Sequence, residues 1–188
     1  MEPMRVKGTT IISTSNFVKN RFGQEGFDRW IEQLSPAARD AITVPLASKW
    51  YDMVDCYTEP LEKIVSTFLG GAIDKGGREI GSENAKHDLT GIYRIMIKFG
   101  SPNLMISGAA RTWNSYYSEG EPEVVENEKG RAVVSIREIP VKSAVWEYSV
   151  AGWVETASML AGGKNNSCRI LSSVASGQGV LKLGLTWE

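Results

Sequence analysis

The stretch KSAVWEYSVAGWVETASML (residues 142–160) decides how this sequence folds, because it is helical in pattern and apolar on nearly every side. Trp146, Val150 and Trp153 recur at helical spacing along one face. Val145 belongs to a second apolar face of the same helix. A helix that is hydrophobic all round is normally buried. We therefore expect this helix to lie in the interior, between other layers of the fold.

The segments on either side of this helix predict β-hairpins. Upstream, Ala132, Val134 and Ile136 alternate with Val133, Ser135 and Arg137, which predicts a strand half-covered by core, with residues 121–126 as its partner strand. Downstream, residues 168–174 and 181–187 alternate in the same way and are joined by the turn SGQG (176–179). The long helix is therefore expected between two hairpins.

The first two-thirds of the chain has helical periodicity. Apolar stripes predict helices over 24–34, 51–69, 79–99 and 101–116, and GGAIDKGG (70–77) is interpreted as a flexible break. The order of elements predicts an α+β fold: an N-terminal helical layer packed on a four-stranded, mostly antiparallel sheet made of two β-hairpins, with the buried helix between them.

We expect one domain over residues 1–188, with a helical part at 1–118 and a hairpin–helix–hairpin part at 119–188. The net charge is -1 and the basic residues are scattered among acids, which argues against nucleic-acid binding. The sequence has no apolar run long enough for a signal peptide or a membrane span, so we expect a cytoplasmic protein. Two cysteines and one histidine, at no ligand spacing, argue against zinc.

The candidate ligand-binding residues are mostly aromatic. They are Tyr93, Arg94, Trp113, Tyr116, Tyr117, Trp146 and Trp153. Large aromatic side chains can line an apolar pocket or fill a core, and the pattern alone allows both. Tyr93 and Arg94 are expected to supply polar contacts. No catalytic or metal-binding residue is predicted.

Other polar residues receive structural interpretations. The only histidine, His87, falls off the apolar stripe of its helix and is expected at the surface or rim. Asp88 is interpreted as a helix cap, or as a partner of Arg94. Glu147 and Glu155 stand two turns apart and are interpreted as a solvated strip.

Several segments carry a family resemblance: VKGTTIISTSNFVKNRFGQEGF, ASKWYD, KHDLTGIYR, RTWNSYY, AGWVETASMLAGGKN and the closing TWE. They resemble an uncharacterised bacterial (myxobacterial-type) family of about this length. That family is similar in layout to the 4-vinyl reductase domain and to the haem nitric-oxide/oxygen-binding domain. The resemblance implies a pocket for a small-molecule or lipid-like ligand between the helical layer and the sheet, used for sensing or regulation.

The cofactor prediction also depends on this resemblance. Haem-binding relatives use a histidine on a helix and a Tyr-x-Ser-x-Arg motif, whereas this chain has Asn114-Ser115-Tyr116-Tyr117-Ser118 without that arginine. Relatives of the 4-vinyl reductase type tend to carry cysteines in the last hairpin, and residues 171–188 contain neither cysteine nor histidine. We therefore predict no cofactor, with haem and zinc both disfavoured.

Three functions are compatible with these observations. The leading hypothesis is a non-enzymatic sensory or regulatory module that binds a small apolar ligand in an aromatic-lined pocket. The alternative is a protein-interaction or scaffolding domain, for example a homodimer, without a pocket. The third is an enzyme that reduces a vinyl group, which depends on the domain resemblance alone.

Overall fold

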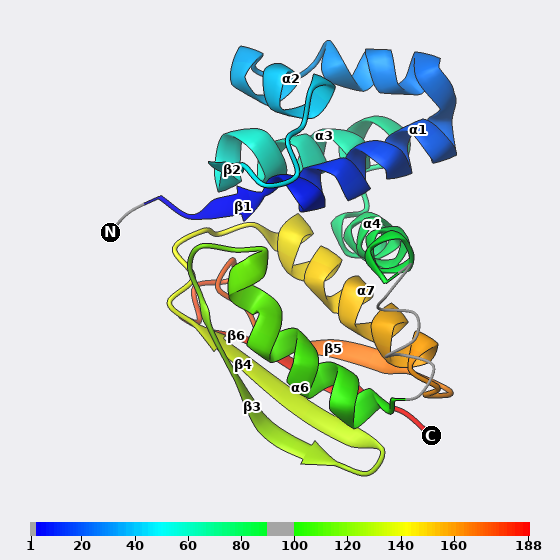
Figure 1. Ribbon diagram of the computed structural model, residues 1–188, viewed down its shortest axis with the longest axis vertical. Helices are drawn as coiled ribbons and strands as arrows, with labels where there is room; N and C mark the ends of the chain where they lie inside the picture. Colours follow the sequence, from blue (N-terminus) through cyan, green and yellow to red (C-terminus); the bar gives the residue numbers. More distant parts are fainter. Residues whose placement is uncertain (1–2, 90–99) are drawn as a thin grey trace.

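The computed structural model describes residues 3–89 and 100–188. Its architecture is α+β, with a layer of N-terminal helices, a long central helix and a four-stranded sheet (Figure 1). The predicted fold class is therefore confirmed. Residues 90–99, which include the predicted pocket residues Tyr93 and Arg94, lie outside the described residues.

The N-terminal part holds most of the helical layer. Its elements are β1 (Arg5–Lys7), α1 (Gly8–Ile31), α2 (Pro36–Thr43), β2 (Trp50–Asp52), the π-helix η1 (Val54–Thr58), α3 (Glu59–Phe68) and α4 (Ile73–Asp88). Helix α1 kinks at Gly23, where φ is 72°, so the chain changes direction at this glycine. The short antiparallel pair β1–β2 was not predicted from the sequence.

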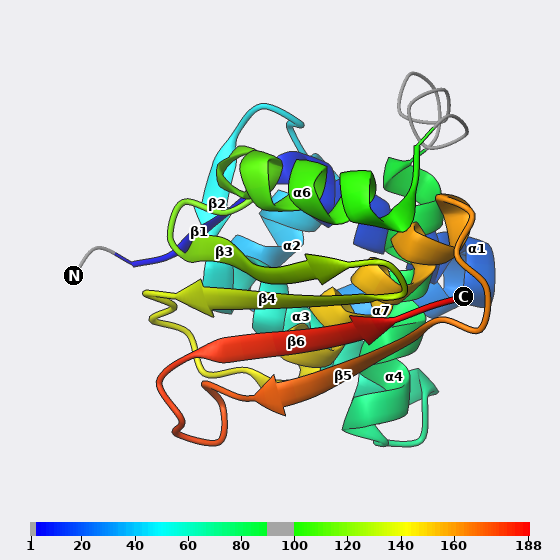
Figure 2. The ribbon, with the colours of Figure 1, turned by 90° about the horizontal axis from the view of Figure 1, so that it is seen from below.

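The C-terminal part contains the sheet and the helices that cover it. Its elements are α6 (Pro102–Thr112), the 3₁₀-helix η2 (Trp113–Ser115), β3 (Glu121–Glu128), β4 (Arg131–Arg137), α7 (Ala144–Leu160), β5 (Ser167–Ser172) and β6 (Leu181–Thr186). The strand order is β3-β4-β6-β5, and every neighbouring pair is antiparallel (Figure 2). The two predicted hairpins therefore join along β4 and β6.

Helix α7 is the predicted central helix. It lies between α4 and the sheet (Figure 1), and Trp146 within it is 0% exposed. Burying an aromatic side chain removes about 150–250 Å² from water, an upper estimate of about 4–6 kcal/mol per residue. The most exposed apolar residues of α7 lie at its C-terminal end, where Met159 is 50% and Leu160 is 40% exposed. Burial of this helix is thus a main source of stability.

Glycines allow α4 and α7 to approach closely. Gly81 of α4 faces the backbone of Ser149 in α7, and Gly152 of α7 faces the backbone of Arg78 in α4. Gly77 also belongs to this contact, so the prediction of a flexible break over 70–77 is wrong in its second half. The break is confined to the residues before α4, because a helix interior tolerates glycine where a neighbouring backbone leaves no space for Cβ.

None of the helices within residues 3–89 and 100–188 is both long enough and apolar enough to cross a membrane.

Candidate functional site

A cavity of about 110 Å³ lies where α4, α6, α7 and the sheet meet. Val134 and Leu183, paired across β4 and β6, form its floor. Helix α6 contributes Ala109 and Ala110 to the lining. Their side chains are small, so larger residues at these positions would reduce the space between α6 and the sheet.

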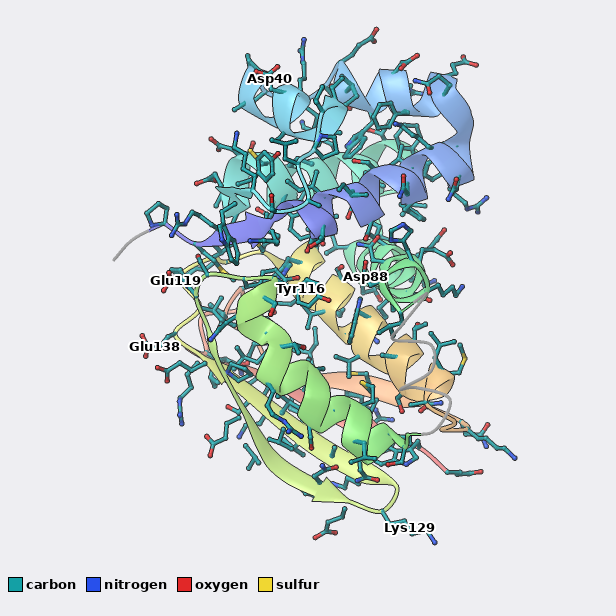
Figure 3. All side chains as sticks on the ribbon, in the orientation of Figure 1. Asp40, Asp88, Tyr116, Glu119, Lys129 and Glu138 are labelled. Atoms are coloured by element: carbon teal, nitrogen blue, oxygen red, sulfur yellow. The ribbon has the colours of Figure 1, made fainter. Side chains whose placement is uncertain are left out.

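Aromatic side chains line one wall of the cavity. Trp113, Tyr116, Tyr117 and Trp153 all contact it, and Tyr116 lies at the end of α6 and η2 (Figure 3). Trp146 stands behind them in the core, with its ring 5.7 Å from that of Tyr117 and 6.2 Å from that of Trp113. The structure therefore places four of the predicted pocket residues around one cavity, and places Trp146 in their supporting layer.

Three polar residues gather at the end of the cavity next to α4. Tyr57 comes from η1, and Asn84 and Asp88 come from α4. Asn84 is 3% exposed; its Nδ2 donates to Thr14 Oγ1 (2.9 Å), and its buried Oδ1 has no hydrogen-bond partner. A buried acceptor without a donor is unfavourable by about 1–3 kcal/mol, so this atom is a place where a ligand could donate.

Asp88 is held between three helices (Figure 3). Ser13 Oγ of α1 donates to Asp88 Oδ1, and Trp153 Nε1 of α7 donates to Asp88 Oδ2 (3.1 Å). Burial raises the pKa of the Asp88 carboxyl, although these two hydrogen bonds and the nearby His87 oppose the rise. Sequence reasoning assigned Asp88 a capping role and missed its position on the cavity, because the side chains that hold it are distant in sequence.

His87 lies outside the cavity, as its place on the helix predicted. Its side chain is 47% exposed and occupies a groove between α1 and α4. Its Nδ1 is 3.0 Å from Ser13 Oγ, and its Nε2 is 3.1 Å from Asn16 Nδ2. These contacts connect His87 to Asp88 through Ser13, on the α1 side of α4.

The predicted solvated strip on α7 is wrong for Glu147. Glu147 is 1% exposed and accepts hydrogen bonds from Ser173 Oγ (2.5 Å) and the Ala175 backbone N–H (3.0 Å). Glu155 accepts from the Cys168 backbone N–H (2.8 Å) and forms an ion pair with Arg78 (3.4 Å). Both glutamates therefore attach α7 to neighbouring segments, although the Glu155 side chain is 37% exposed and also faces water.

Comparison with known proteins identifies the fold. No protein-family model matches the chain, and no curated protein matches it. Solved structures match the chain over almost its full length, at low sequence identity. The H-NOX protein of S. oneidensis in its Fe(II)NO state is 12% identical over 97% of this chain and 99% of its own, with a TM-score of 0.74. This chain has an H-NOX-like fold. The unliganded Fe(II) H-NOX protein of K. algicida agrees: it is 12% identical over 97% of this chain and 96% of its own, with a TM-score of 0.70.

The H-NOX-like fold agrees with the expected similarity to the haem nitric-oxide/oxygen-binding domain. The resemblances to the 4-vinyl reductase domain and to the myxobacterial-type family stay predictions, as do the homodimer and the vinyl-reducing enzyme.

The prediction of no cofactor is contradicted by these neighbours. A further similar structure concerns heme distortion in the H-NOX family; it is 13% identical over 97% of this chain and 95% of its own, with a TM-score of 0.68. Haem therefore has to be counted among the ligands that this fold can carry. The prediction depended on local sequence motifs, whereas the fold depends on the pattern of buried residues and persists at low identity.

A histidine-ligated haem needs a histidine side chain in its pocket. The described residues around the cavity include neither histidine nor cysteine, and His87 faces the groove between α1 and α4. A volume of about 110 Å³ is also below the ~300–1,000 Å³ of pockets for drug-sized ligands. The described lining thus does not fit a histidine-ligated haem.

Two tyrosines of the site, the buried Tyr57 and the partly buried Tyr117, make stability sensitive to alkaline pH. Burial raises the pKa of Tyr57 to about 12 and that of Tyr117 well above its ordinary value. The unfolded chain loses these protons near pH 10, whereas the folded chain keeps them to higher pH. The contribution of the two protonated tyrosines to the free energy of unfolding is therefore complete below pH 10 and declines as the pH rises towards 12.

We expect Tyr57→Phe to reduce this decline by about 1.4 kcal/mol per pH unit, the effect of one proton. The measurement is urea unfolding at several pH values between 9 and 12. Tyr148→Phe, a partly exposed tyrosine on α7, is the control. Equal pH dependence in Tyr57→Phe and the wild type would show that the Tyr57 hydroxyl does not keep its proton in the folded state.

Proposed function

We propose that this chain is a sensory domain that binds a small, largely apolar ligand in the cavity between α4, α6, α7 and the sheet. The observation that carries the proposal is the cavity itself, lined by aromatic and aliphatic side chains with a few polar groups at one end. Ligand pockets in proteins have this composition: an apolar lining and a small number of polar atoms that fix orientation.

The position of the cavity supports a sensory role. Its lining comes from the helical layer, from α6, from α7 and from the sheet, so one ligand would contact every layer at once. A ligand that binds one relative arrangement of these layers more tightly shifts the population towards that arrangement. Iron- and NO-bearing states are recorded for similar H-NOX proteins, which makes ligand-dependent sensing a reasonable function for this fold.

The test is a titration of the purified protein with toluene, a neutral apolar probe, and separately with hemin, followed by tryptophan fluorescence and calorimetry. Trp113 and Trp153 line the cavity and report on its occupancy. We expect toluene to bind with a Kd of about 0.1–1 mM. Ala109→Leu fills the space beside α6 and should weaken the binding of either probe at least about tenfold.

The control variant is Leu104→Ala, on the same helix, where Leu104 is 63% exposed and does not line the cavity. It should bind both probes as the wild type does. Hemin that binds the wild type and is blocked by Ala109→Leu would also support the proposal, with haem as the ligand. If neither probe binds, or if Ala109→Leu binds both unchanged, the proposed function is wrong.

A further inference from the structure

The described residues that line the cavity carry negative charge and no positive charge. Asp88 is the one acidic side chain among the described residues that contact the cavity, and that set includes no lysine, arginine or histidine. Next to it stands Asn84, whose buried Oδ1 has no donor. From this arrangement we infer that the cavity selects an amine with a small apolar body, whose ammonium group lies between Asp88 and Asn84. This inference rests on the proposed function and specifies the ligand class.

The two acceptors are placed to act together. Asn84 and Asp88 are four residues apart in α4, so their side chains lie one above the other on the same face of the helix, about 5–6 Å apart at Cβ. An ammonium group has three N–H donors and can reach two such acceptors at once. The spacing therefore suits one ammonium group bound to both side chains.

Asp88 retains the capacity to accept from a ligand. Each of its oxygens accepts one hydrogen bond from the protein, from Ser13 and from Trp153, and a carboxylate oxygen has a second lone-pair site. Both donors are neutral groups. Among the described residues its ion-pair partner is His87, with Nδ1 3.6 Å from Asp88 Oδ1, and His87 is outside the cavity. A cation inside the cavity would pair with Asp88 through the second lone-pair sites.

The aromatic wall favours the same ligand class. Tyr116, Tyr117 and Trp153 contact the cavity, and the indole of Trp153 is hydrogen-bonded to Asp88 itself. A cation close to aromatic faces is stabilised by their quadrupoles, by about 0.5–2 kcal/mol. A ligand with a carboxylate in place of the ammonium group would be repelled by Asp88 and by the negative faces of the aromatic rings. The lining therefore discriminates by charge as well as by shape.

The size of the cavity limits the apolar body. Its volume of about 110 Å³ is close to that of an engineered cavity of ~150 Å³ that binds benzene. The body is thus a single ring or a short branched chain. Taking an ammonium group out of water is costly, and this offsets part of its attraction to Asp88. We therefore expect a moderate preference for the amine.

The experiment compares four probes of nearly equal size by calorimetry at neutral pH: benzylamine, benzyl alcohol, toluene and benzoate. The expected order of affinity is benzylamine, benzyl alcohol, toluene, benzoate, with benzylamine about tenfold or more tighter than toluene. Asp88→Asn should abolish the advantage of benzylamine over toluene and leave toluene binding in place. The order of affinities measured with the wild-type protein tests the inference by itself, even if Asp88→Asn does not fold.

The matched control is Glu83→Gln, which removes an acid from the same helix. Glu83 pairs with Lys86 and lies in the groove outside the cavity, so the preference for benzylamine should be unchanged. If toluene or benzoate binds as tightly as benzylamine, or if Asp88→Asn keeps the preference, the inference is wrong while the proposed function stands. If none of the four probes binds, the proposed function itself fails.

Discussion

Gly81→Val is expected to lower the free energy of unfolding by about 3 kcal/mol or more, enough to leave the fold marginal. A Cβ at position 81 would lie 1.9 Å from the Ser149 carbonyl oxygen, which belongs to the backbone of α7 and cannot rotate away. Helices α4 and α7 would have to separate. Because α7 is the centre of the core, that separation would disturb the packing on both of its sides.

The measurement is urea unfolding followed by circular dichroism, with Gly81→Ala as a smaller step. In an ordinary helix interior, glycine to alanine stabilises by about 0.5–1 kcal/mol. At position 81 we expect the opposite sign, because even one methyl group meets the backbone of α7. The control is Gly108→Ala in α6, where a Cβ would meet nothing within 4 Å and the ordinary gain should appear. Equal gains at the two positions would contradict the close approach of α4 and α7.

The sequence predicts the central part of this fold well and the α4–α7 contact poorly. A helix apolar on nearly every side has only one stable location, so the burial of α7 follows from its composition. The hairpins follow equally from alternation. By contrast, Gly77 and Gly81 resemble ordinary breakers of a helix in the sequence. These glycines allow the backbone of α7 to pack closely against α4, and a local sequence pattern does not predict that contact.

The residues of the candidate site were likewise predicted only in part. The aromatic residues before the first hairpin were expected near a pocket because large side chains cluster there, and Trp113, Tyr116 and Tyr117 do lie around the cavity. Their role in binding stays a prediction. Asn84 and Asp88 were missed as cavity residues, because their positions depend on contacts with α1 and α7 that span more than sixty residues. Periodicity reports which face of a helix is apolar, and it does not report a polar group held inside.

Glu147→Ala is expected to lower the free energy of unfolding by about 2–4 kcal/mol. The carboxylate of Glu147 is buried, and it accepts from Ser173 Oγ and from the Ala175 N–H in the connection between β5 and β6. Truncation to alanine leaves both donors without an acceptor and creates a void next to the start of α7. We expect Glu147→Gln to cost less, about 1–2 kcal/mol, because its Oε1 can still accept from Ala175.

Urea unfolding gives the stability of each variant, and hydrogen exchange gives a local measurement at the Ala175 amide. That amide should exchange faster in Glu147→Ala than in the wild type, since its acceptor has been removed. Met159→Ala is the control on the same helix, because Met159 is 50% exposed and its truncation should change stability by no more than about 0.5 kcal/mol. A loss below about 1 kcal/mol in Glu147→Ala, with unchanged exchange at Ala175, would mean that the glutamate does not hold the last hairpin to α7.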